Sequence, residues 1–338
     1  MSESGLSGAG PSRRRIIKAT GALAAGLAAP GLLRIGRAYA AYPERVVKIV
    51  VANSPGGPSD IIARFMAAAL QEMMGKTFIV ENKGGGGNIG MGAVARADPD
   101  GYTLLLATSA YAVNPGLYAS LPYDPFKDFA PISEIATTPN VFTVKRELAA
   151  NTMKEFVALA KANPDGFNVS TPPIGTTPQL EAEVLKIREG LGTMATIVFA
   201  GGGEALQAVL GGTVQLSSGT LAPALPQIKA GAIKGLAVTG ATRWPELPEI
   251  PTMLEAGYKD FVFETYTALL APAKTSPEIV SRLEQETLAV LGRADMRSKL
   301  SESGFEVQAK DGKGHMARVA KEVPMFREII TQAGIKPQ

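Results

Sequence analysis

The sequence of 338 residues contains no cysteine and a single histidine, His315. Without cysteine the chain can form no disulfide, offers no thiol nucleophile and cannot build a thiolate metal site. A metal site made of several histidines is excluded as well, and a serine–histidine–aspartate mechanism would have to use His315. Because His315 follows Lys313 and Gly314 near the start of a predicted C-terminal helix, we expect it on the surface, without a role in chemistry.

Excess charge of one sign is also absent once the first 40 residues are set aside. The whole chain has a formal charge of +3, but residues 1–40 contain six basic side chains and one acidic side chain. The remainder holds 28 basic and 30 acidic residues, a net charge of −2. This part of the chain therefore has no general basic field that would attract nucleic acid or an anionic membrane.

Long hydrophobic runs are missing too. The apolar segment 19–33 has 15 residues, is interrupted by glycine and proline, and is too short to span a membrane comfortably. It follows a basic stretch in which Arg13 and Arg14 fit a twin-arginine (Tat) export signal. An uncleaved anchor or a disordered tail is the alternative interpretation.

Small residues after this segment supply a signal-peptidase site, with Ala38 and Ala40 at its key positions. We therefore predict a signal peptide over residues 1–40 that is cleaved after Ala40. Since no cysteine follows, a lipoprotein anchor is excluded. The mature chain is expected free in the periplasm of a Gram-negative bacterium.

The rest of the chain alternates short β-like runs with helical segments. This pattern predicts an α/β protein with mainly parallel sheets covered by helices, long enough for two domains. The predicted strands are 46–51, 78–81, 103–107, 140–144, 167–170, 196–199, 214–217, 235–239 and 266–271. The predicted helices are 61–74, 89–97, 153–163, 178–189, 203–210, 222–230, 277–292, 294–303 and 313–333.

The junction between the first strand and the first helix has the form of an anion site. An apolar β-branched run ends at a Pro-Gly-Gly turn, residues 55–57, and an Ala- and Met-rich helix follows. Such a junction directs free backbone N–H groups and the positive end of a helix dipole to one point, where a carboxylate or phosphate can bind without a lysine. Ser59 and Asp60 are both candidates for the helix cap. A simple tight βα turn is the alternative.

Further motifs follow in an order that resembles a known family. Residues 77–83 read TFIVENK, 84–90 read GGGGNIG, and 98–107 read DPDGYTLLLA. Together with the turn at 55–60, they resemble the Bug (TctC-type) periplasmic solute receptors of tripartite tricarboxylate transporters. Additional matches are found at 123–129, 205–214, 228–239, 248–257 and 269–272. The resemblance covers nearly the whole chain after residue 40.

The resemblance implies a two-domain, type II periplasmic-binding-protein-like fold with mixed, mainly parallel sheets. Domain 1 would comprise residues 42–142 plus 268–338, and domain 2 residues 143–267, with two crossing segments between them. A ligand would bind in the cleft between the domains, where strands end and helices begin. No cofactor and no metal are implied.

Six loops are expected to reach this cleft. They follow strands or precede helices on the predicted cleft side, and they supply hydroxyls and backbone amides for a carboxylate. The predicted ligand-binding residues are Ser54, Pro55, Gly56, Gly57, Ser59, Asp60, Thr108, Ser109, Gly175, Thr176, Thr177, Gln179, Phe199, Gly202, Gly203, Ser218, Gly219 and Tyr266. Among them, Thr176 or Thr177 is expected to cap a helix, and Asp60 to cap its own helix rather than meet a like charge.

Three of the six loops depart from the pattern of the family. Gln179 stands where a histidine is common, Phe199 and Ala200 replace a tyrosine and a lysine, and Gly219 replaces an aspartate. These changes favour a ligand with one carboxylate and an aromatic or weakly polar body over citrate or a free amino acid. Alternatively, loops that never touch the ligand have simply diverged.

The resemblance therefore predicts a monomeric transport receptor that delivers a small carboxylate to a membrane permease. A receptor that presents its ligand to a periplasmic sensor would use the same fold. A periplasmic hydrolase or dehydrogenase is the third hypothesis. Against it, the sequence has no G-x-S-x-G motif, and no acidic residue follows the loop 84–90 at the spacing that a dinucleotide site requires to hold the ribose.

Overall fold

The computed structural model describes residues 42–84 and 87–336. The predicted signal peptide, with Arg13, Arg14, Ala38 and Ala40, lies outside the described residues, as do Gly85 and Gly86 of the glycine-rich loop. The chain divides into Met1–Tyr42 and one compact unit, Pro43–Gln338. Within the described residues, none of the helices combines the length and the apolar character needed to span a bilayer.

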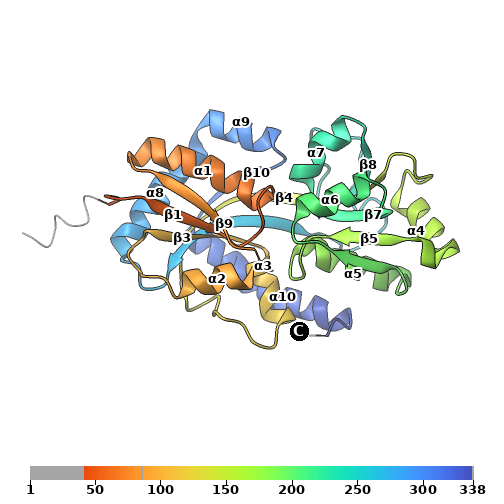
Figure 1. The fold of residues 1–338 in the computed structure, drawn as a ribbon, viewed down its shortest axis with the longest axis horizontal. Helices are drawn as coiled ribbons and strands as arrows, with labels where there is room; N and C mark the ends of the chain where they lie inside the picture. Colours follow the sequence, from red (N-terminus) through yellow and green to blue (C-terminus); the bar gives the residue numbers. More distant parts are fainter. Residues whose placement is uncertain (1–41, 85–86, 337–338) are drawn as a thin grey trace, which may run out of the picture. The chain divides into compact units, whose positions relative to one another are not determined.

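Strands and helices alternate along the compact unit (Figure 1). The strands are β1 (Val47–Val51), β2 (Phe78–Asn82), β3 (Thr103–Thr108), β4 (Phe129–Lys145), β5 (Asn168–Thr171), β6 (Ala195–Val198), β7 (Leu216–Thr220), β8 (Ile233–Val238), β9 (Glu264–Pro272) and β10 (Glu306–Asp311). The helices are α1 (Pro58–Met74), α2 (Asn88–Ala95), α3 (Ala110–Leu117), α4 (Met153–Ala162), α5 (Thr177–Glu189), α6 (Gly202–Leu210), α7 (Leu221–Lys229), α8 (Pro277–Gly292), α9 (Ala294–Glu302) and α10 (Gly312–Gln332), with a short 3₁₀ turn at Pro164–Gly166.

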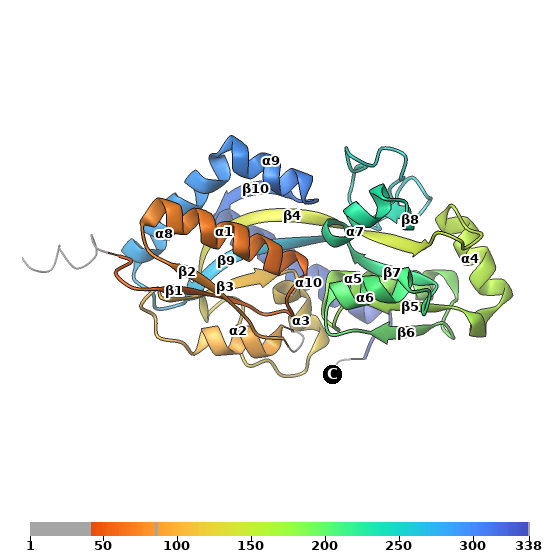
Figure 2. The same ribbon diagram turned by 45° about the horizontal axis from the view of Figure 1, so that its top comes forward.

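The strands form two groups that share β4. In the first group the order is β2-β1-β3-β9-β4, with β10 also paired to β4; in the second it is β4-β7-β5-β6, with β8 paired to β4. Residues Phe129 to Pro139 of β4 pair with β9, whereas Asn140 to Lys145 pair with β7 and β8. A single long strand therefore runs from one group into the other (Figure 2).

Parallel and antiparallel pairs are mixed. Strand β1 is parallel to β2 and β3, and β5 is parallel to β6 and β7, as strand–helix alternation predicts. Every antiparallel pair involves β4 or β9. The sheets are thus less parallel than the sequence suggested, because these two strands run against their neighbours.

Helices cover the strand groups, as Figures 1 and 2 show. The spacing of residues along a helix decides which face is buried. In α10 the buried residues recur every three or four positions and are Gly312, His315, Val319, Val323, Phe326 and Ile330. This spacing places His315 in the core, not on the surface as predicted. Its Nδ1 lies 3.3 Å from the carboxylate of Glu134, and burial lowers the pKa of its imidazole.

The start of α1 differs from the prediction. Gly57 is the N-cap and Pro58 the first helical residue, so Ser59 and Asp60 lie inside the first turn instead of capping it. The Asp60 carboxylate accepts the Gly56 N–H at 3.0 Å and pairs with Arg64. Burial would raise the pKa of Asp60, but these hydrogen bonds outweigh it and hold the pKa below its usual value.

Candidate ligand-binding cleft

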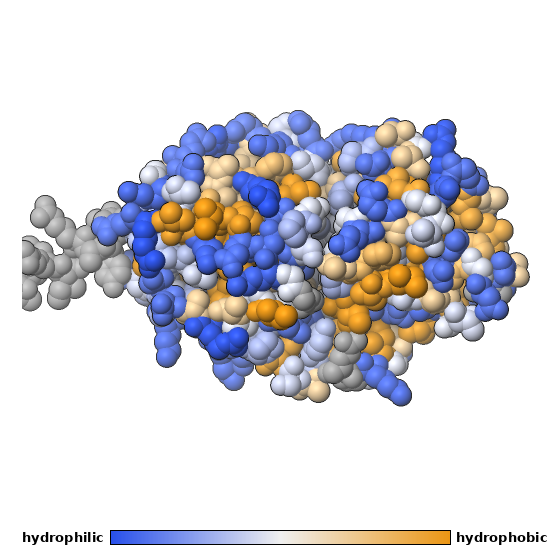
Figure 3. Space-filling view, in the orientation of Figure 1, coloured by the Kyte–Doolittle hydropathy of each residue, from blue (hydrophilic) through white to orange (hydrophobic). Residues whose placement is uncertain are grey.

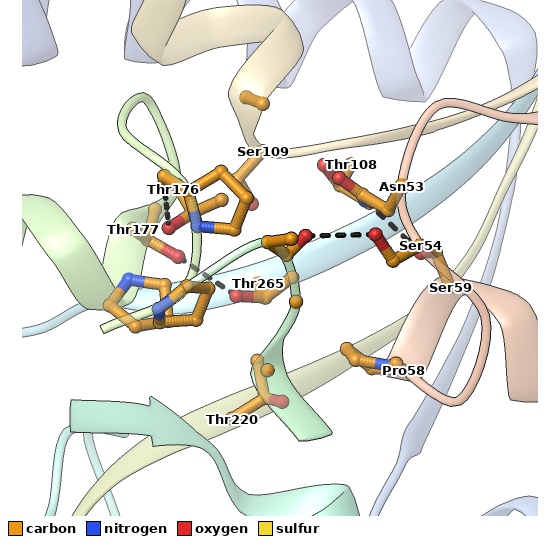
Figure 4. Close-up of a pocket in the computed structure, with 18 residues that line it drawn as sticks. Asn53, Ser54, Pro58, Ser59, Thr108, Ser109, Thr176, Thr177, Thr220 and Thr265 are labelled. Carbon is orange, nitrogen blue, oxygen red and sulfur yellow. Dashed lines mark hydrogen bonds between the residues drawn. The ribbon is translucent and has the colours of Figure 1, made fainter. Parts of the chain in front are cut away.

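A pocket with about 510 Å³ of empty space, partly open to solvent, lies where the two strand groups meet. Figure 3 shows a narrow furrow in the surface there, and Figure 4 shows the side chains around the pocket. Its lining is Asn53, Ser54, Gly57, Pro58, Ser59, Thr108, Ser109, Ala110, Pro172, Pro173, Thr176, Thr177, Pro178, Ala200, Gly201, Gly202, Thr220 and Thr265.

Five helices begin on this pocket. Their N-cap residues are Gly57 for α1, Ser109 for α3, Thr176 for α5, Gly201 for α6 and Thr220 for α7, and all five line it. None of the five makes a side-chain cap hydrogen bond. The first-turn N–H groups of these helices therefore have no side-chain cap, and the positive ends of five helix dipoles converge.

The hydroxyls that could cap two of these helices are used elsewhere. The Thr176 hydroxyl, at the predicted cap position, donates to the carbonyl of Pro173 at 2.8 Å. The Ser109 hydroxyl donates to the carbonyl of Glu264 and accepts the N–H of Tyr266 at 2.9 Å. The helix starts are thereby left available to a bound group.

None of the eighteen described lining residues carries a charge. Hydroxyl groups come from Ser54, Ser59, Thr108, Ser109, Thr176, Thr177, Thr220 and Thr265, and apolar surface comes from the prolines and from Ala110 and Ala200. An anion in this pocket would be stabilised by backbone dipoles and hydroxyls, not by a cationic side chain.

Of the predicted ligand-binding residues, eight line the pocket: Ser54, Gly57, Ser59, Thr108, Ser109, Thr176, Thr177 and Gly202. They come from four loops of the sequence that the folded chain brings together. Their contact with a ligand stays a prediction.

The other predicted residues lie beside or behind the pocket. Pro55 and Gly56 belong to the turn before α1, and Asp60, in the first turn of α1, faces Gly56 and Arg64. Gly203 is in the first turn of α6, directly after the lining residue Gly202.

Gly175 precedes α5 and Gln179 lies in its first turn, in an arrangement that matches Gly56 and Asp60 at α1. The Gln179 side-chain oxygen accepts the Gly175 N–H at 3.5 Å, and Gly175 has a φ of +90°. A Cβ at Gly175 would overlap the side-chain oxygen of Asn114, which belongs to α3 in the other strand group. Both residues thus shape the loop rather than line the pocket.

Three further predicted residues do not line the pocket: Phe199, Ser218 and Gly219. Phe199 packs against the apolar cluster of the second strand group, and the Ser218 hydroxyl is buried against Pro178 and Glu181. Gly219 borders a separate space of about 230 Å³ behind the start of α6.

Tyr266 lies on the wrong face of its strand for a cleft residue. It is fully buried, with its ring 5.2 Å from that of His315 and with Arg318 over it. Its neighbour Thr265 lines the pocket instead, because successive side chains of a strand point to opposite faces. In the sequence, only this alternation could have identified Thr265 as a pocket residue. Using it requires knowing which face of the strand is turned toward the cleft.

The architecture and the pocket define a class of protein. Two α/β strand groups joined by shared long strands, with helix starts facing a cleft, form the periplasmic-binding-protein fold. A profile of the family described as the tripartite tricarboxylate transporter family receptor, TctC, matches residues 62–335. The chain therefore belongs to the TctC, or Bug, family of solute receptors, whose members bind their solutes without transforming them, so it is not an enzyme.

Individual relatives agree with this assignment. The chain is 30% identical to protein BugT of Bordetella pertussis over 299 residues, 87% of this chain and 91% of BugT. It is 34% identical to the solved periplasmic binding protein BugD, with a TM-score of 0.84, covering 88% of this chain and 100% of BugD. It is 32% identical to Rpa4515 of R. palustris, solved with adipate, with a TM-score of 0.84 over 88% of this chain and 100% of that one.

Proposed function

We propose that this receptor binds a small carboxylate in the cleft and delivers it to a tripartite tricarboxylate-type membrane permease. The observation that carries the proposal is the convergence of five helix starts without side-chain caps on an uncharged pocket. A carboxylate suits such a site, since backbone N–H groups and dipoles favour negative charge. The adipate bound by the relative Rpa4515 supports the same class of ligand.

The ligand we favour carries an aromatic or weakly polar body. The lining offers no cation for a second or third carboxylate and no acid for an ammonium group. Ala200 and several prolines supply apolar contact, and the space beside Gly219 is bordered by Val141, Leu206 and Ala224. Phe199 adds nothing to this preference, because it packs against the apolar cluster of the second strand group and does not line the pocket.

A thermal-shift screen of the mature protein tests the proposal. The panel comprises adipate, malate, citrate, benzoate and glutamate, each at several concentrations. A carboxylate at about a hundred times its Kd adds about 2.7 kcal/mol to the free energy of unfolding. A shift with benzoate supports both the carboxylate and the weakly polar body, a shift only with adipate, malate, citrate or glutamate keeps the carboxylate and contradicts the body without a second charge, and no shift with any of them contradicts the carboxylate.

A substitution at Gly219 tests the shape of the site. A Cβ there meets no atom within 4 Å, so Gly219→Leu places apolar bulk beside the lining residues Gly202 and Thr220. We expect weaker binding of benzoate, with malate affected less. Gly192→Leu adds the same side chain at an exposed position with nothing within 4 Å, and serves as the control.

We also propose that the protein reaches the periplasm through the Tat pathway and is cleaved after Ala40. The sequence pattern around Arg13 and Arg14 supports the route. Replacing both arginines with lysine should retain the precursor in the cytoplasm. Mass spectrometry of periplasmic protein should give an N-terminus at Ala41, and another N-terminus would contradict the cleavage site.

The receptor is proposed to act as a monomer of two domains, 42–142 plus 268–338 and 143–267, which close on the ligand. The change of partners along β4 after Pro139 supports a boundary near the predicted one. Small-angle scattering with and without a confirmed ligand checks closure, and a constant radius of gyration would contradict it.

A further inference from the structure

A chain of hydrogen bonds runs from the pocket into the protein interior. Thr177 and Thr265 both line the pocket, and their hydroxyl oxygens are 2.8 Å apart (Figure 4). The Thr265 hydroxyl donates to the side-chain oxygen of Asn140 at 3.0 Å. Because the one proton of Thr265 is used there, the Thr177 hydroxyl is the donor in the contact between the two threonines.

Behind Asn140 lies the carboxyl group of Glu181. The side-chain amide of Asn140 donates to Oε2 of Glu181 at 2.8 Å, and neither side chain is exposed to solvent. Asn140 belongs to the part of β4 that pairs with the second strand group, and Thr265 belongs to β9. The hydrogen-bonded chain thus includes both long strands at the point where the strand groups meet.

The other oxygen of Glu181 reveals where a proton lies. Ser218 Oγ is 2.7 Å from Glu181 Oε1 and 2.8 Å from the carbonyl oxygen of Pro178. Both neighbours can accept from Ser218, but its hydroxyl has a single proton for the two contacts. A proton on Glu181 satisfies both contacts, because Glu181 then donates to Ser218 while Ser218 donates to Pro178.

Nothing around Glu181 compensates a negative charge. The groups facing it are Asn140 from β4, Ser218 from β7 and Thr239 after β8, and none of them titrates. Burial raises the pKa of the Glu181 carboxyl to about 8, and no charge among the described residues contributes to this pKa.

Charged side chains on the same helix are engaged elsewhere. Lys186 donates to Glu183 and to Thr196, and Thr196 donates to Glu183. These contacts form a separate group toward β6, so they do not neutralise Glu181.

We propose that Glu181 is a positioning residue, held as a neutral acid, that fixes the hydrogen-bond direction of the pocket floor through Asn140. The proposal rests on the proposed carboxylate site. The acceptor oxygen of Glu181 holds the side-chain amide of Asn140 in one orientation. The side-chain oxygen of Asn140 then accepts the hydrogen bond from the Thr265 hydroxyl. Thr177 and Thr265 therefore present oxygen lone pairs, and no O–H donors, to the pocket. A carboxylate is thus directed away from them and toward the helix starts.

Ionisation of Glu181 follows at alkaline pH. It places an uncompensated negative charge two hydrogen-bonded groups below the pocket, where a carboxylate ligand is repelled. Affinity for an anion should fall as pH rises through about 8. Glu181→Gln keeps one acceptor and one donor in place but cannot ionise, so it should remove this pH dependence.

The first test needs no ligand. Infrared spectra of the mature protein at pH 7 should contain the C=O stretching band of a buried protonated carboxylic acid. The band should be missing in Glu181→Gln and present in Glu183→Gln, the control on the same helix. Equal spectra for the wild type and Glu181→Gln in this region would overturn the proposal.

The second test is calorimetric titration of adipate at pH 7 and pH 9, since adipate is a dianion at both. We expect the wild type and Glu183→Gln to bind about tenfold more weakly at pH 9, and Glu181→Gln to bind equally at the two pH values. An unchanged wild-type affinity would overturn the positioning role. If adipate binds at neither pH, benzoate, which is an anion at both, replaces it in the same titration; binding of neither would count against the proposed function, while the infrared band still decides the state of Glu181.

Discussion

The hydroxyl of Ser54 donates a hydrogen bond of 2.9 Å to the backbone carbonyl of Ala200, which stands 146 residues further along the chain. Ser54 follows β1 in the first strand group, and Ala200 precedes α6 in the second. A Cβ on the neighbouring Gly201 would lie 3.3 Å from the Cβ of Ser54, so the two loops are in close contact. This bond joins the two rims of the pocket (Figure 4).

Replacing Ser54 with alanine should weaken the closed form. A net hydrogen bond contributes about 0.5–1.5 kcal/mol, so we expect Kd for the best carboxylate of the panel to rise about two- to tenfold. Calorimetric titration measures it. Ser303→Ala removes a hydroxyl that bonds to Lys299 on the surface and should leave Kd unchanged. Equal Kd values for wild type and Ser54→Ala would show that this bond does not favour the bound state.

Two neighbouring residues of β9 should respond oppositely to the loss of a hydroxyl. Thr265→Val leaves Thr177 and Asn140 without their partner, and we expect the free energy of unfolding to drop by about 1–3 kcal/mol and affinity to fall with it. The Tyr266 hydroxyl is buried without a hydrogen-bond partner among the described residues, so Tyr266→Phe should keep or raise stability and leave affinity unchanged. Urea unfolding and titration check both, and a loss of affinity in Tyr266→Phe would return that residue to the site.

Stability should depend on pH through Glu181. Its pKa is about 8 in the folded protein against an ordinary value of 4.5, so the folded state keeps a proton that the unfolded chain releases between these limits. The stabilisation is complete below 4.5 and is lost as pH rises, by about 1.4 kcal/mol per pH unit up to about 8. Urea unfolding at pH 5.5, 6.5 and 7.5 should show this slope in the difference between wild type and Glu181→Gln. A constant difference would contradict the raised pKa.

Alanine at Gly175 and at Gly190 should separate backbone strain from a steric clash. Both glycines have positive φ, at +90° and +67°, but only a Cβ on Gly175 meets a side chain, that of Asn114. We expect Gly190→Ala to cost about 1–2 kcal/mol and Gly175→Ala at least about 1 kcal/mol more, together with weaker ligand binding. Urea unfolding measures the costs, and equal values would mean that the Asn114 contact is easily relieved.

Hydrophobic periodicity and turn residues predicted much of the fold. The run before Pro55 is a buried strand, the segment after it is a helix, and α8 has the bounds that the sequence predicts. Local signals sufficed because β1 is a short apolar run before a Pro-Gly-Gly turn, while α1 and α8 each bury one face and end at or before glycine. They also identified the loops at the helix starts, since a loop between a strand and a helix is local in sequence.

Features that depend on tertiary packing could not be predicted from local sequence signals. Strand β10 is polar and half-exposed, the first half of β4 contains serine, threonine and proline, and α3 is short and contains Pro115, so none had a strong periodic signal. The choice of Tyr266 over Thr265 failed because one position along a strand exchanges the two faces. The surface placement of His315 failed because it rested on the basic residues nearby, Lys313 and Arg318, although the spacing of His315 to Val319 and Val323 indicated a buried face.

Strand β4 has a mechanical consequence for the molecule as a whole. Since β4 pairs with β9 and β10 in one strand group and with β7 and β8 in the other, neither group can unfold without loosening a strand that lies inside the other. Melting should then be a single all-or-none event despite the length of the chain. A solute bound where the two strand groups meet would therefore stabilise regions that it does not contact. Resistance to proteolysis far from the cleft would then show that the solute is bound.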